Sequence, residues 1–404
     1  MAVTEDQVRA ALRQVLDPEI GKPIEDLGML KGIEVEGDRV RVYVLLTIAG
    51  CPLRERIDSD VRRALGTLEG VDPLGAEVIL GEMTDEQRQA MVTTLRGGAP
   101  AQGGDGHAGH DHGHGQGQPA GMPQQPTFFT DGKTTVITVA SGKGGVGKSS
   151  VTVNLASALA SEGHRVGVLD ADVWGFSVPR MMGVSGQRPV AFNEMILPLE
   201  SHGVRIISMG FFVDEETPVI WRGPMLHKAI NQFLGDVYWG ELDYLLIDLP
   251  PGTGDVSISL ASFLPGAQML VVTTPQEAAR KVAERAGKMA ERTHLRPIGV
   301  IENMSWFECP HCGDRTRIFG EGGGQEAADT LGVPLVGQVP LYPPLREGGD
   351  EGTPLVVSDP DSAAGRSLRE AARRIAQESR SIVGKPLNLM VAPGAQPAGS
   401  AHQH

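Results

Sequence analysis

A glycine-rich segment between an apolar run and a helical pattern constrains the fold of this chain more than any other feature. The segment is Ser141 to Ser150, SGKGGVGKSS, and it follows the apolar run 136–140. Its spacing G-x-x-x-x-G-K-S is typical of a phosphate-binding loop that joins a strand to a helix. The alternative, a glycine-rich turn without a ligand, is disfavoured by the strand and helix patterns on either side. The sequence therefore predicts a nucleotide site.

The residue types in this segment match the chemistry of phosphate binding. Glycines allow backbone N–H groups to turn inward around phosphate oxygens, and the helix N-terminus adds partial positive charge. Lys148 is expected to reach the β- and γ-phosphates, and Ser149 to place its hydroxyl on Mg²⁺. The nucleotide-binding residues expected in the loop are Gly142, Lys143, Gly144, Gly145, Val146, Gly147, Lys148, Ser149 and Ser150.

Composition limits the class of protein. The chain has 404 residues, of which 40% are hydrophobic, so it is long enough for two domains with substantial cores. A formal net charge of -14 disfavours a nucleic-acid partner held through phosphate contacts. The first residues lack a basic region and an apolar core, and no apolar run reaches the roughly 18 residues that span a bilayer. We expect a soluble, cytoplasmic protein with no membrane and no nucleic-acid partner.

From residue 134 onward, apolar runs of β type alternate with helical ones, which is typical of an α/β fold with a mostly parallel sheet flanked by helices. Ligands of such open sheets bind at the carboxyl ends of the strands. The expected strands are 134–140, 165–170, 204–209, 244–249, 267–273, 298–303 and 334–339. The expected helices are about 148–162, 224–236, 256–264, 276–293, 323–331 and 361–380.

Two of the expected strands end in carboxylates that suit this edge of the sheet. The apolar strand 244–247 ends in Asp248, where a P-loop enzyme needs its second support for Mg²⁺, usually through a bound water. Asp170 and Asp172 are spaced by one residue, so they point the same way in an extended segment. We predict that Asp172 orients the attacking water and that Asp170 is a weaker metal-side candidate. The alternatives are an ordinary strand end at Asp248 and helix capping by Asp170 or Asp172.

Residues 1–96 have the pattern of a separate small α+β domain. Helical spacing over 4–16 is followed by a hairpin (30–35 and 39–48), a helix after Pro52, a strand over 76–80 and a helix over 84–95. The segments Asp17-Pro18-Glu19-Ile20, Asp26-Leu27-Gly28-Met29 and Thr47 to Pro52 resemble the small domain of SufT-type proteins in iron–sulfur assembly. In that family the cysteine of T-x-x-x-C-P is the reactive position, which is Cys51 here. A half-buried cysteine without a function is the alternative.

Residues 97–126 are expected to be a flexible linker because they are rich in Gly and Pro and contain no Lys or Arg. Four histidines in it could bind a divalent metal loosely, and a plain polar spacer is the alternative; they are His107, His110, His112 and His114. A P-loop ATPase domain is expected over 127–384, and a disordered tail over 385–404.

Lys143 is unusual for a phosphate loop, because a standard loop needs no lysine one position after its first glycine. The run from Gly142 to Ser149 resembles the deviant phosphate loop of the MinD/ParA class. In that class the early lysine reaches across a dimer interface to the partner's nucleotide. The resemblance implies a homodimer in which ATP holds two subunits together, with Lys143, Lys148 and Asp172 as the catalytic residues. A solvated loop lysine is the alternative.

Further segments narrow the resemblance to the Mrp/ApbC-type iron–sulfur carrier ATPases, over about residues 130–380. The matching segments are 170–179, 221–224, 248–255, 273–277 and 302–305, the last of which leads into Cys309-Pro310-His311-Cys312-Gly313. Trp174 and Phe176 stand where Tyr and Pro are more usual. The resemblance implies a Mg²⁺-dependent ATPase in which Asn303 contacts the adenine.

Cys309 and Cys312 are two of only three cysteines in the chain. Two thiolates at this spacing can hold one face of a metal centre, whereas Zn²⁺ or a [4Fe–4S] cluster needs four ligands. Two copies in a symmetric dimer bring four thiolates to the two-fold axis. Together with the resemblance, this predicts a [4Fe–4S] cluster that is shared between subunits, received from a scaffold protein and passed to recipient apoproteins. A shared structural Zn²⁺ and a redox dithiol are the alternatives.

Two other functions stay open on the sequence alone. A MinD/ParA-like positioning or partition ATPase with a structural zinc would share the loop and Lys143. Against it, the last expected helix is followed by a Gly/Pro/Ala tail and not by a membrane-binding helix. A chaperone for another metal would use the histidines of 97–126.

Overall fold

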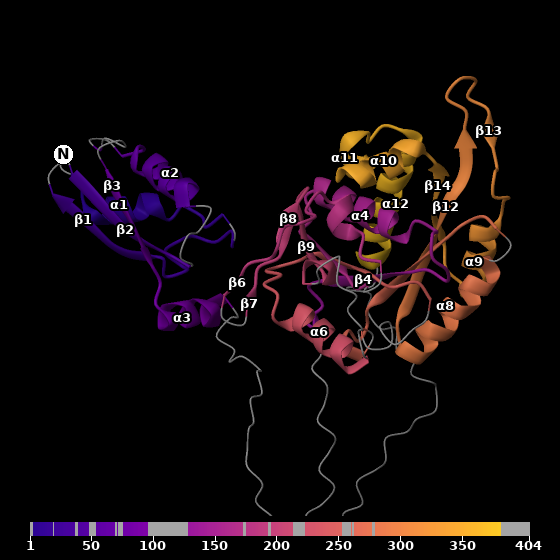
Figure 1. The fold of residues 1–404 in the computed structure, drawn as a ribbon, viewed down its shortest axis with the longest axis horizontal. Coiled ribbons are helices and arrows are strands. Elements are labelled where there is room, and N and C mark those ends of the chain that lie inside the picture. Colours follow the sequence, from indigo (N-terminus) through magenta and orange to yellow (C-terminus); the bar gives the residue numbers. More distant parts are fainter. Residues whose placement is uncertain are drawn as a thin grey trace, which may run out of the picture.

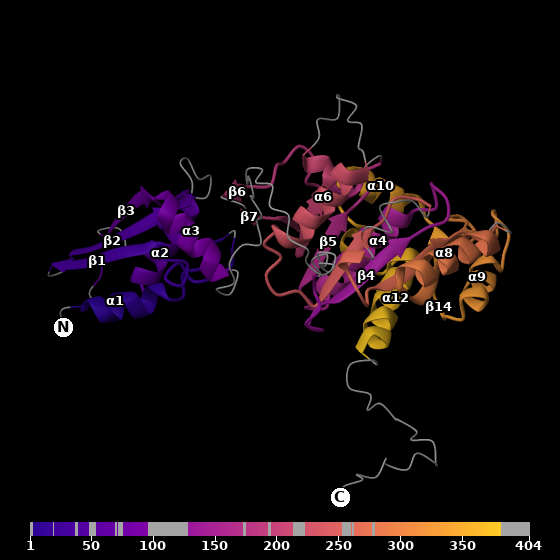
Figure 2. The ribbon, with the colours of Figure 1, turned by 90° about the horizontal axis from the view of Figure 1, so that it is seen from below.

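The computed structural model describes residues 3–18, 20–36, 39–47, 54–68, 71, 76–95, 128–172, 175–192, 195–212, 223–252, 260, 262–276 and 279–380. A three-stranded sheet belongs to the first part of the chain and a nine-stranded sheet to the rest, and the two lie side by side as separate bodies (Figures 1 and 2). The linker expected over 97–126 with its four histidines, the tail expected over 385–404 and Cys51 lie outside the described residues.

The first body packs helices on a short mixed sheet. Its elements are α1 (Glu5–Leu12), β1 (Leu30–Glu36), β2 (Arg39–Leu46), α2 (Arg54–Leu65), β3 (Glu77–Glu82) and α3 (Asp85–Leu95). β2 pairs antiparallel with β1 and parallel with β3. Thr4 caps α1 in a reciprocal capping box with Gln7. The helix ends at Leu12, earlier than predicted, because Val15 and Leu16 are extended and pair with the returning chain: the Val15 carbonyl accepts the Ile24 N–H at 3.0 Å, and Leu16 bridges to Pro23.

The second body is built on seven parallel strands with an antiparallel strand at each end. Its strands are β4 (Thr135–Ala140), β5 (Val166–Asp170), β8 (Leu199–Ser201), β9 (Val204–Ser208), β10 (Tyr244–Asp248), β11 (Gln268–Thr273), β12 (Arg296–Glu308), β13 (Arg315–Thr316) and β14 (Leu335–Leu341). The order is β13-β12-β11-β4-β10-β5-β9-β8, and β14 also pairs with β12. The mostly parallel α/β fold predicted from the alternating runs is confirmed, because all seven expected strands are present in it.

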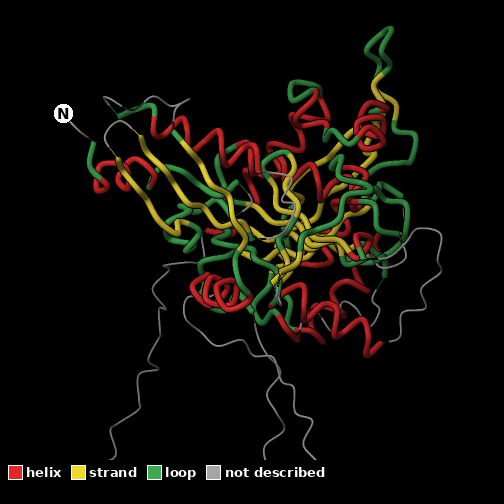
Figure 3. Tube along the Cα trace, turned by 60° about the vertical axis from the view of Figure 1, so that its left-hand side comes forward, coloured by secondary structure: helices red, strands yellow, loops and turns green. Residues whose placement is uncertain are grey.

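Helices cover both faces of this sheet (Figure 3). They are α4 (Lys148–Ser161), α5 (Val178–Met181), η1 (Met209–Phe211), α6 (Gly223–Gly235), α8 (Ala279–Thr293), α9 (Gly323–Leu331), α10 (Pro343–Glu351), α11 (Leu355–Ser358) and α12 (Ala363–Arg380). Neighbouring residues of β4 point to opposite faces, so Val136 joins the apolar cluster with α6 and α8, whereas Ile137 joins the one with α4 and α12. Burial on both faces explains why these strands are continuous apolar runs.

Several elements differ from the sequence prediction. α5, α11 and the two-residue strands β6 (Ala191–Phe192) and β7 (Met195–Ile196) are too short for a periodic pattern to reveal, and α10 was missed because it combines two prolines and two glycines in nine residues. β12 continues to Glu308, five residues beyond its predicted end. The helix expected over 256–264 lies mostly outside the described residues. In the part of the chain that the structure describes, no helix is long and apolar enough to cross a bilayer.

Among the described residues, apolar side chains of the second body pack against the core of the first. Met195 and Leu197, from β7 and the segment after it, are buried in the same cluster as the core of the first body. The Lys22 ammonium also lies 6.0 Å from the centre of the Tyr238 ring. The first body therefore contacts the second on the side of β6 and β7.

Candidate functional site

The phosphate loop lies at the carboxyl end of β4, in the middle of the sheet. Gly145 and Gly147 have φ values of 77° and 81°, in the left-handed region that favours glycine. Gly147 also approaches another chain segment, since a Cβ there would lie 2.2 Å from Asn303 Nδ2. Gly147 immediately precedes α4, so the loop turns directly into the helix N-terminus. The strand–loop–helix arrangement predicted from SGKGGVGKSS is confirmed.

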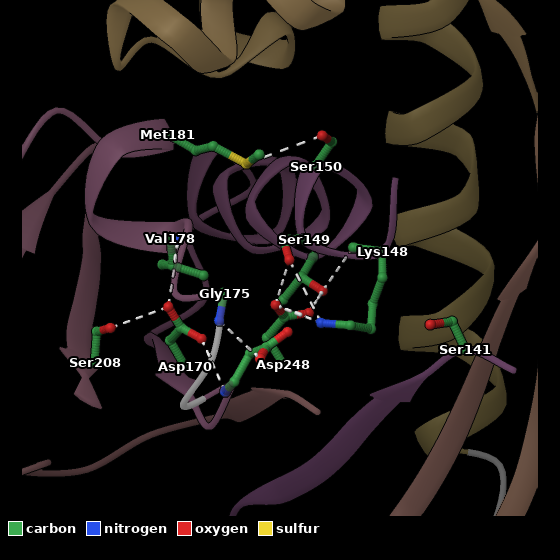
Figure 4. Close-up of polar contacts among 12 residues, drawn as sticks. Ser141, Lys148, Ser149, Ser150, Asp170, Gly175, Val178, Met181, Ser208 and Asp248 are labelled. Atoms are coloured by element: carbon green, nitrogen blue, oxygen red, sulfur yellow. Dashed lines mark hydrogen bonds and ion pairs between the residues drawn. The ribbon is translucent and has the colours of Figure 1, made fainter. Parts of the chain in front are cut away.

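Lys148 and Asp248 form a buried ion pair beneath the loop (Figure 4). Lys148 Nζ lies 2.7 Å from Asp248 Oδ2, and the two side chains are 6% and 0% exposed. Ser149 Oγ donates to the same carboxylate oxygen at 2.5 Å, and Thr152 Oγ1 donates to Asp248 Oδ1 at 2.8 Å. The pairing of β10 with β4 places the end of one strand beside the loop that follows the other. One buried carboxylate therefore gathers the lysine and serine that were predicted to bind phosphate and Mg²⁺.

Asp170 ends the adjacent strand β5 and is fully buried. Ser208 Oγ donates to its Oδ2 at 3.0 Å, and the backbone N–H groups of Asp172 and Val178 donate to its carboxylate at 3.2 and 3.3 Å. Burial, and after it the neighbouring Asp248 carboxylate, raises the pKa of Asp170 to about 8. Asp170 therefore binds a proton more readily than an ordinary aspartate does, as expected for a second carboxylate buried beside Asp248.

Asp172 follows two residues later and lies at the same edge of the sheet. Its side chain is 8% exposed, and its Oδ1 accepts the Gly175 N–H at 3.1 Å. The backbone before it is fixed, because the Ala171 N–H donates to the Asp248 carbonyl at 3.0 Å. The structure thus brings Asp172 and Asp248 to the same end of adjacent strands; the predicted role of Asp172 toward water stays a prediction.

Lys143 is held within its own chain. Its Nζ donates to Gln276 Oε1, in the segment after β11, and Ser141 Oγ donates to the Lys143 carbonyl at 3.1 Å. The predicted reach of Lys143 into a partner subunit therefore requires this contact to open. Gln276 had no sequence signal of its own beyond the matched segment 273–277.

Asn303 lies against the phosphate loop. It is 2% exposed, its Nδ2 donates to the Val146 carbonyl at 2.9 Å, and its Oδ1 accepts the Met304 N–H at 3.0 Å. Its predicted contact with adenine stays a prediction. Glu302, which precedes Asn303 in β12, is 1% exposed and accepts the Gly324 N–H at 2.6 Å, at the start of α9.

Cys309 and Cys312 are carried away from this site on the hairpin of β12 and β13, which projects beyond the helices in Figure 1. The Cys309 N–H donates to the Asp314 carbonyl, and the Gly313 N–H to the Cys309 carbonyl, both at 2.9 Å. Cys309 is half-exposed and Cys312 exposed, and neither forms a disulfide. The backbone N–H groups of Cys312 and His311 lower the pKa of the Cys309 thiol. In the described part of the chain, no group of three or more His, Cys, Asp or Glu side chains gathers around a metal-sized space.

Sequence reasoning missed two polar residues of the site. Thr152 lies one helical turn after Lys148, so helix periodicity could have placed it beside the loop. Ser208, at the end of β9, had no comparable signal, because its contact with Asp170 depends on the pairing of β9 with β5.

The parallel sheet, the left-handed glycines before α4 and the pair of Lys148 with Asp248 define a P-loop NTPase with an additional loop lysine. A family described as "NUBPL iron-transfer P-loop NTPase" matches residues 133–376, which is more than half of the chain. The chain belongs to this family. A second family, described as "Iron-sulfur cluster assembly protein", matches residues 5–78. The resemblances predicted from the sequence for both parts of the chain are thereby confirmed.

Individual relatives match along nearly the whole chain. An "Iron-sulfur cluster carrier protein" of Mycobacterium leprae is 48% identical over 389 residues, covering 95% of this chain and 95% of the relative. A protein of the same description from Synechocystis sp. is 41% identical, covering 93% and 97%. Among solved structures, a nucleotide-binding protein from Archaeoglobus fulgidus in complex with ADP is 40% identical over 55% of this chain and 87% of that chain, with a TM-score of 0.49.

Proposed function

We propose that this protein is an ATP-hydrolysing iron–sulfur cluster carrier, which binds a [4Fe–4S] cluster between two subunits and transfers it to apoproteins. One observation carries the proposal: a single strand, β12, lies against the phosphate loop at Asn303 and leads directly into the turn with the half-exposed Cys309 and the exposed Cys312. The family match and the names of the relatives support the cargo. The positioning or partition ATPase shares only the fold.

Nucleotide binding begins when Lys148 exchanges the Asp248 carboxylate for phosphate oxygens as its anionic partner. In the structure its ammonium neutralises Asp248, and incoming phosphates offer it a second set of anionic oxygens. Once Lys148 turns to phosphate, the Asp248 carboxylate and the Ser149 hydroxyl, which share a hydrogen bond, are the hard oxygen donors that suit Mg²⁺. Bound Mg²⁺ would neutralise charge on the β- and γ-phosphates.

Hydrolysis requires a positioned water and added positive charge. Asp172 is the carboxylate at this edge that can accept a hydrogen bond from the water, since Asp170 is enclosed by Ser208 and by backbone donors. Lys143 supplies the additional charge. It leaves Gln276 and reaches the partner's nucleotide, so that turnover depends on dimer formation.

Cluster binding depends on the same dimer. Each chain offers two thiols at the tip of the hairpin, and two chains supply the four ligands that a [4Fe–4S] cluster needs. The lowered pKa of Cys309 favours the thiolate, which is the form that binds iron. An exposed and shared cluster is accessible to a recipient apoprotein, which suits transfer.

Iron and sulfide analysis of the anaerobically purified full-length protein tests the proposal. We expect about four Fe and four sulfides per dimer in the wild type. Cys309→Ala should lose this iron and keep nucleotide binding. His311→Ala is the matched control, because it changes a side chain in the same turn but removes no thiol, and it should keep the iron. Stoichiometric Zn²⁺ that survives iron–sulfur reconstitution would overturn the assignment in favour of a structural zinc.

A further inference from the structure

β12 changes character at Met304. Up to Glu302 it pairs with both β11 and β14, and beyond that point it leaves β11. Asn303 pairs with Val339 and Phe307 with Leu341, so four residues of β12 advance against two of β14. Met304 itself has a φ of 59°, a left-handed conformation that is unfavourable for a side chain of this kind. The strand is therefore divided into an inner part in the sheet and an outer part, residues 305–308, that leads to Cys309.

The inner part is fixed to the phosphate loop at the residue before Met304. Asn303 donates to the Val146 carbonyl at 2.9 Å, and its amide lies so close to Gly147 that a Cβ there would be 2.2 Å away. The same side chain accepts the Met304 N–H at 3.0 Å. A shift of the loop around bound phosphates therefore displaces Asn303 and, through it, the backbone at Met304.

The outer part returns to the sheet at almost the same place. After β13 the chain continues into α9. The Gly324 N–H in the first turn of α9 donates to Glu302 of β12 at 2.6 Å. A Cβ at Gly324 would lie 2.6 Å from Glu302 Cβ, so this contact is close-packed. Both ends of the segment 305–322 are thus fixed at Glu302 and Asn303. The hairpin that carries Cys309 and Cys312 is therefore attached to the sheet at a point adjacent to the nucleotide site.

Two buried polar atoms without a partner in the protein lie where this hairpin joins the sheet. Among the described residues, the buried side-chain polar atoms without a hydrogen-bond partner are Trp306 Nε1 and Thr274 Oγ1. Trp306 lies two residues beyond Met304, and Thr274 directly follows the β11 residue that pairs with Glu302. Buried side-chain polar atoms without a partner in the protein are rare, and each calls for a specific local explanation. The left-handed backbone, the irregular pairing and the unpaired atoms coincide at one point of the strand.

We propose that Met304 is a positioning residue, the hinge at which the nucleotide state of the phosphate loop sets the orientation of Cys309 and Cys312. The inference rests on the proposed function for its two ends, and it adds the element that links them. A loop occupied by nucleotide moves Asn303, the Met304 backbone follows, and the hairpin tip changes its accessibility. A hinge of this kind gives each nucleotide state its own geometry of the cluster ligands.

The hinge is tested by thiol modification in cluster-free, chelator-treated full-length protein with Cys51→Ser, so that Cys309 and Cys312 are the reacting thiols. Rates with Ellman's reagent are compared with and without Mg-ADP, at a protein concentration where light scattering finds only monomer, which excludes protection by a partner. In the wild type we expect the rates to differ by about fivefold or more, the lower end of ordinary coupling. Equal rates in the wild type would overturn the inference.

Two substitutions separate the backbone from the side chain. Met304→Ala keeps the left-handed constraint and should keep the wild-type ratio of rates. Met304→Gly removes the constraint and should bring the ratio to within about twofold while Mg-ADP still binds. His294→Gly is the matched control, since His294, with a φ of 55°, precedes the other end of β12 and should keep the ratio. A backbone hinge is contradicted if Met304→Gly keeps the wild-type ratio of thiol reaction rates. It is also contradicted if the Ala and Gly variants lower this ratio equally.

Hydrogen exchange of the wild type keeps the test decisive if Met304→Gly does not fold. Binding of Mg-ADP should change protection across residues 304–316 as well as in the phosphate loop; a change confined to the loop refutes the hinge. Iron content of the anaerobic protein is measured separately. If the wild type reacts equally fast with and without Mg-ADP but has a normal iron content, the hinge is refuted and cluster binding is not. If the two rates differ but the anaerobic protein contains no iron, the proposed cluster is refuted and the hinge is not.

Discussion

The inner and outer parts of β12 differ in almost every physical property, although they belong to one strand. Inner residues such as Val300 and Glu302 are nearly inaccessible to solvent and pair with strands on both sides. The outer part ends in a turn whose cysteines are accessible, with two residue pairs to β13. The polar residues of the phosphate loop are therefore gathered within one chain, whereas one chain offers only two of the four thiolates that the proposed cluster needs. This difference indicates which parts of the function one subunit can perform alone.

The cysteine turn offers the largest expected effect. Cys309→Ala should remove essentially all cluster iron, because two chains would then offer only two thiolates. Unfolding should hardly change, since surface substitutions usually alter stability by less than about 0.5 kcal/mol. Iron and sulfide analysis together with thermal unfolding check both points. A large loss of stability without metal present would show that the outer part is structural and would break the contrast with the inner part.

Lys143 tests whether the nucleotide site is complete in one chain. Lys143→Ala should lower kcat by about 10²–10³-fold, as removal of a charge that acts in the transition state does, with a much smaller change in ATP affinity. Steady-state hydrolysis and equilibrium binding of ATP measure the two quantities.

Lys133→Ala is the control for Lys143, because Lys133 is an exposed lysine just before the amino end of β4. It should leave both kcat and affinity unchanged. Unchanged turnover in Lys143→Ala would make the loop an ordinary phosphate loop, sufficient without a partner.

Truncation of aliphatic side chains compares the packing of the helix that follows the phosphate loop with that of the segment that follows the cysteine hairpin. Leu155, in α4 beneath the phosphate loop, is 1% exposed, whereas Ile318, after β13, is 53% exposed. Leu155→Ala should lower the free energy of unfolding by about 2–5 kcal/mol through lost burial and a residual cavity. Ile318→Ala should change it by less than about 0.5 kcal/mol. Urea unfolding measures both, and similar losses would mean that the segment after β13 is packed as tightly as α4.

Sequence reasoning worked where local pattern and tertiary role agree. The loop from Gly142 to Ser149 specifies its own geometry, because left-handed glycines and a following helix are encoded within a few residues. The apolar strand before Asp248 is buried on both faces, so its composition identifies it. The edge at which Asp172 and Asn303 lie then follows from the direction of parallel strands.

The remaining features depend on contacts between distant segments. The left-handed φ of Met304 cannot be expected from a methionine, and it is held by Asn303 and by irregular pairing with β14. Gln276 becomes the partner of Lys143 only when the segment after β11 lies beside the loop. The extension of β12 to Glu308 depends on pairing with β13, whose two residues carry no strand signal of their own.

An ion pair at the opposite edge of the sheet provides the smallest expected effect and a control for charge effects at the site. Asp243, just before β10, accepts hydrogen bonds from Arg165, which lower the pKa of Asp243 to about 2. Its ordinary pKa is 3.8, so the pair stabilises the folded protein above about pH 4, and this contribution is lost as the pH falls toward about 2.

Asp243→Asn should therefore lower the free energy of unfolding at pH 7 by no more than about 1 kcal/mol, because the pair is partly exposed and screened by solvent. The difference from the wild type should vanish by about pH 2. Asp361→Asn, at an exposed carboxyl on the same body, is the matched control and should show no such pH dependence. Hydrolysis should be unaffected in both variants. If Asp243→Asn lowered kcat as strongly as Lys143→Ala, the nucleotide site would extend through the whole length of the strands and would not be confined to their carboxyl ends.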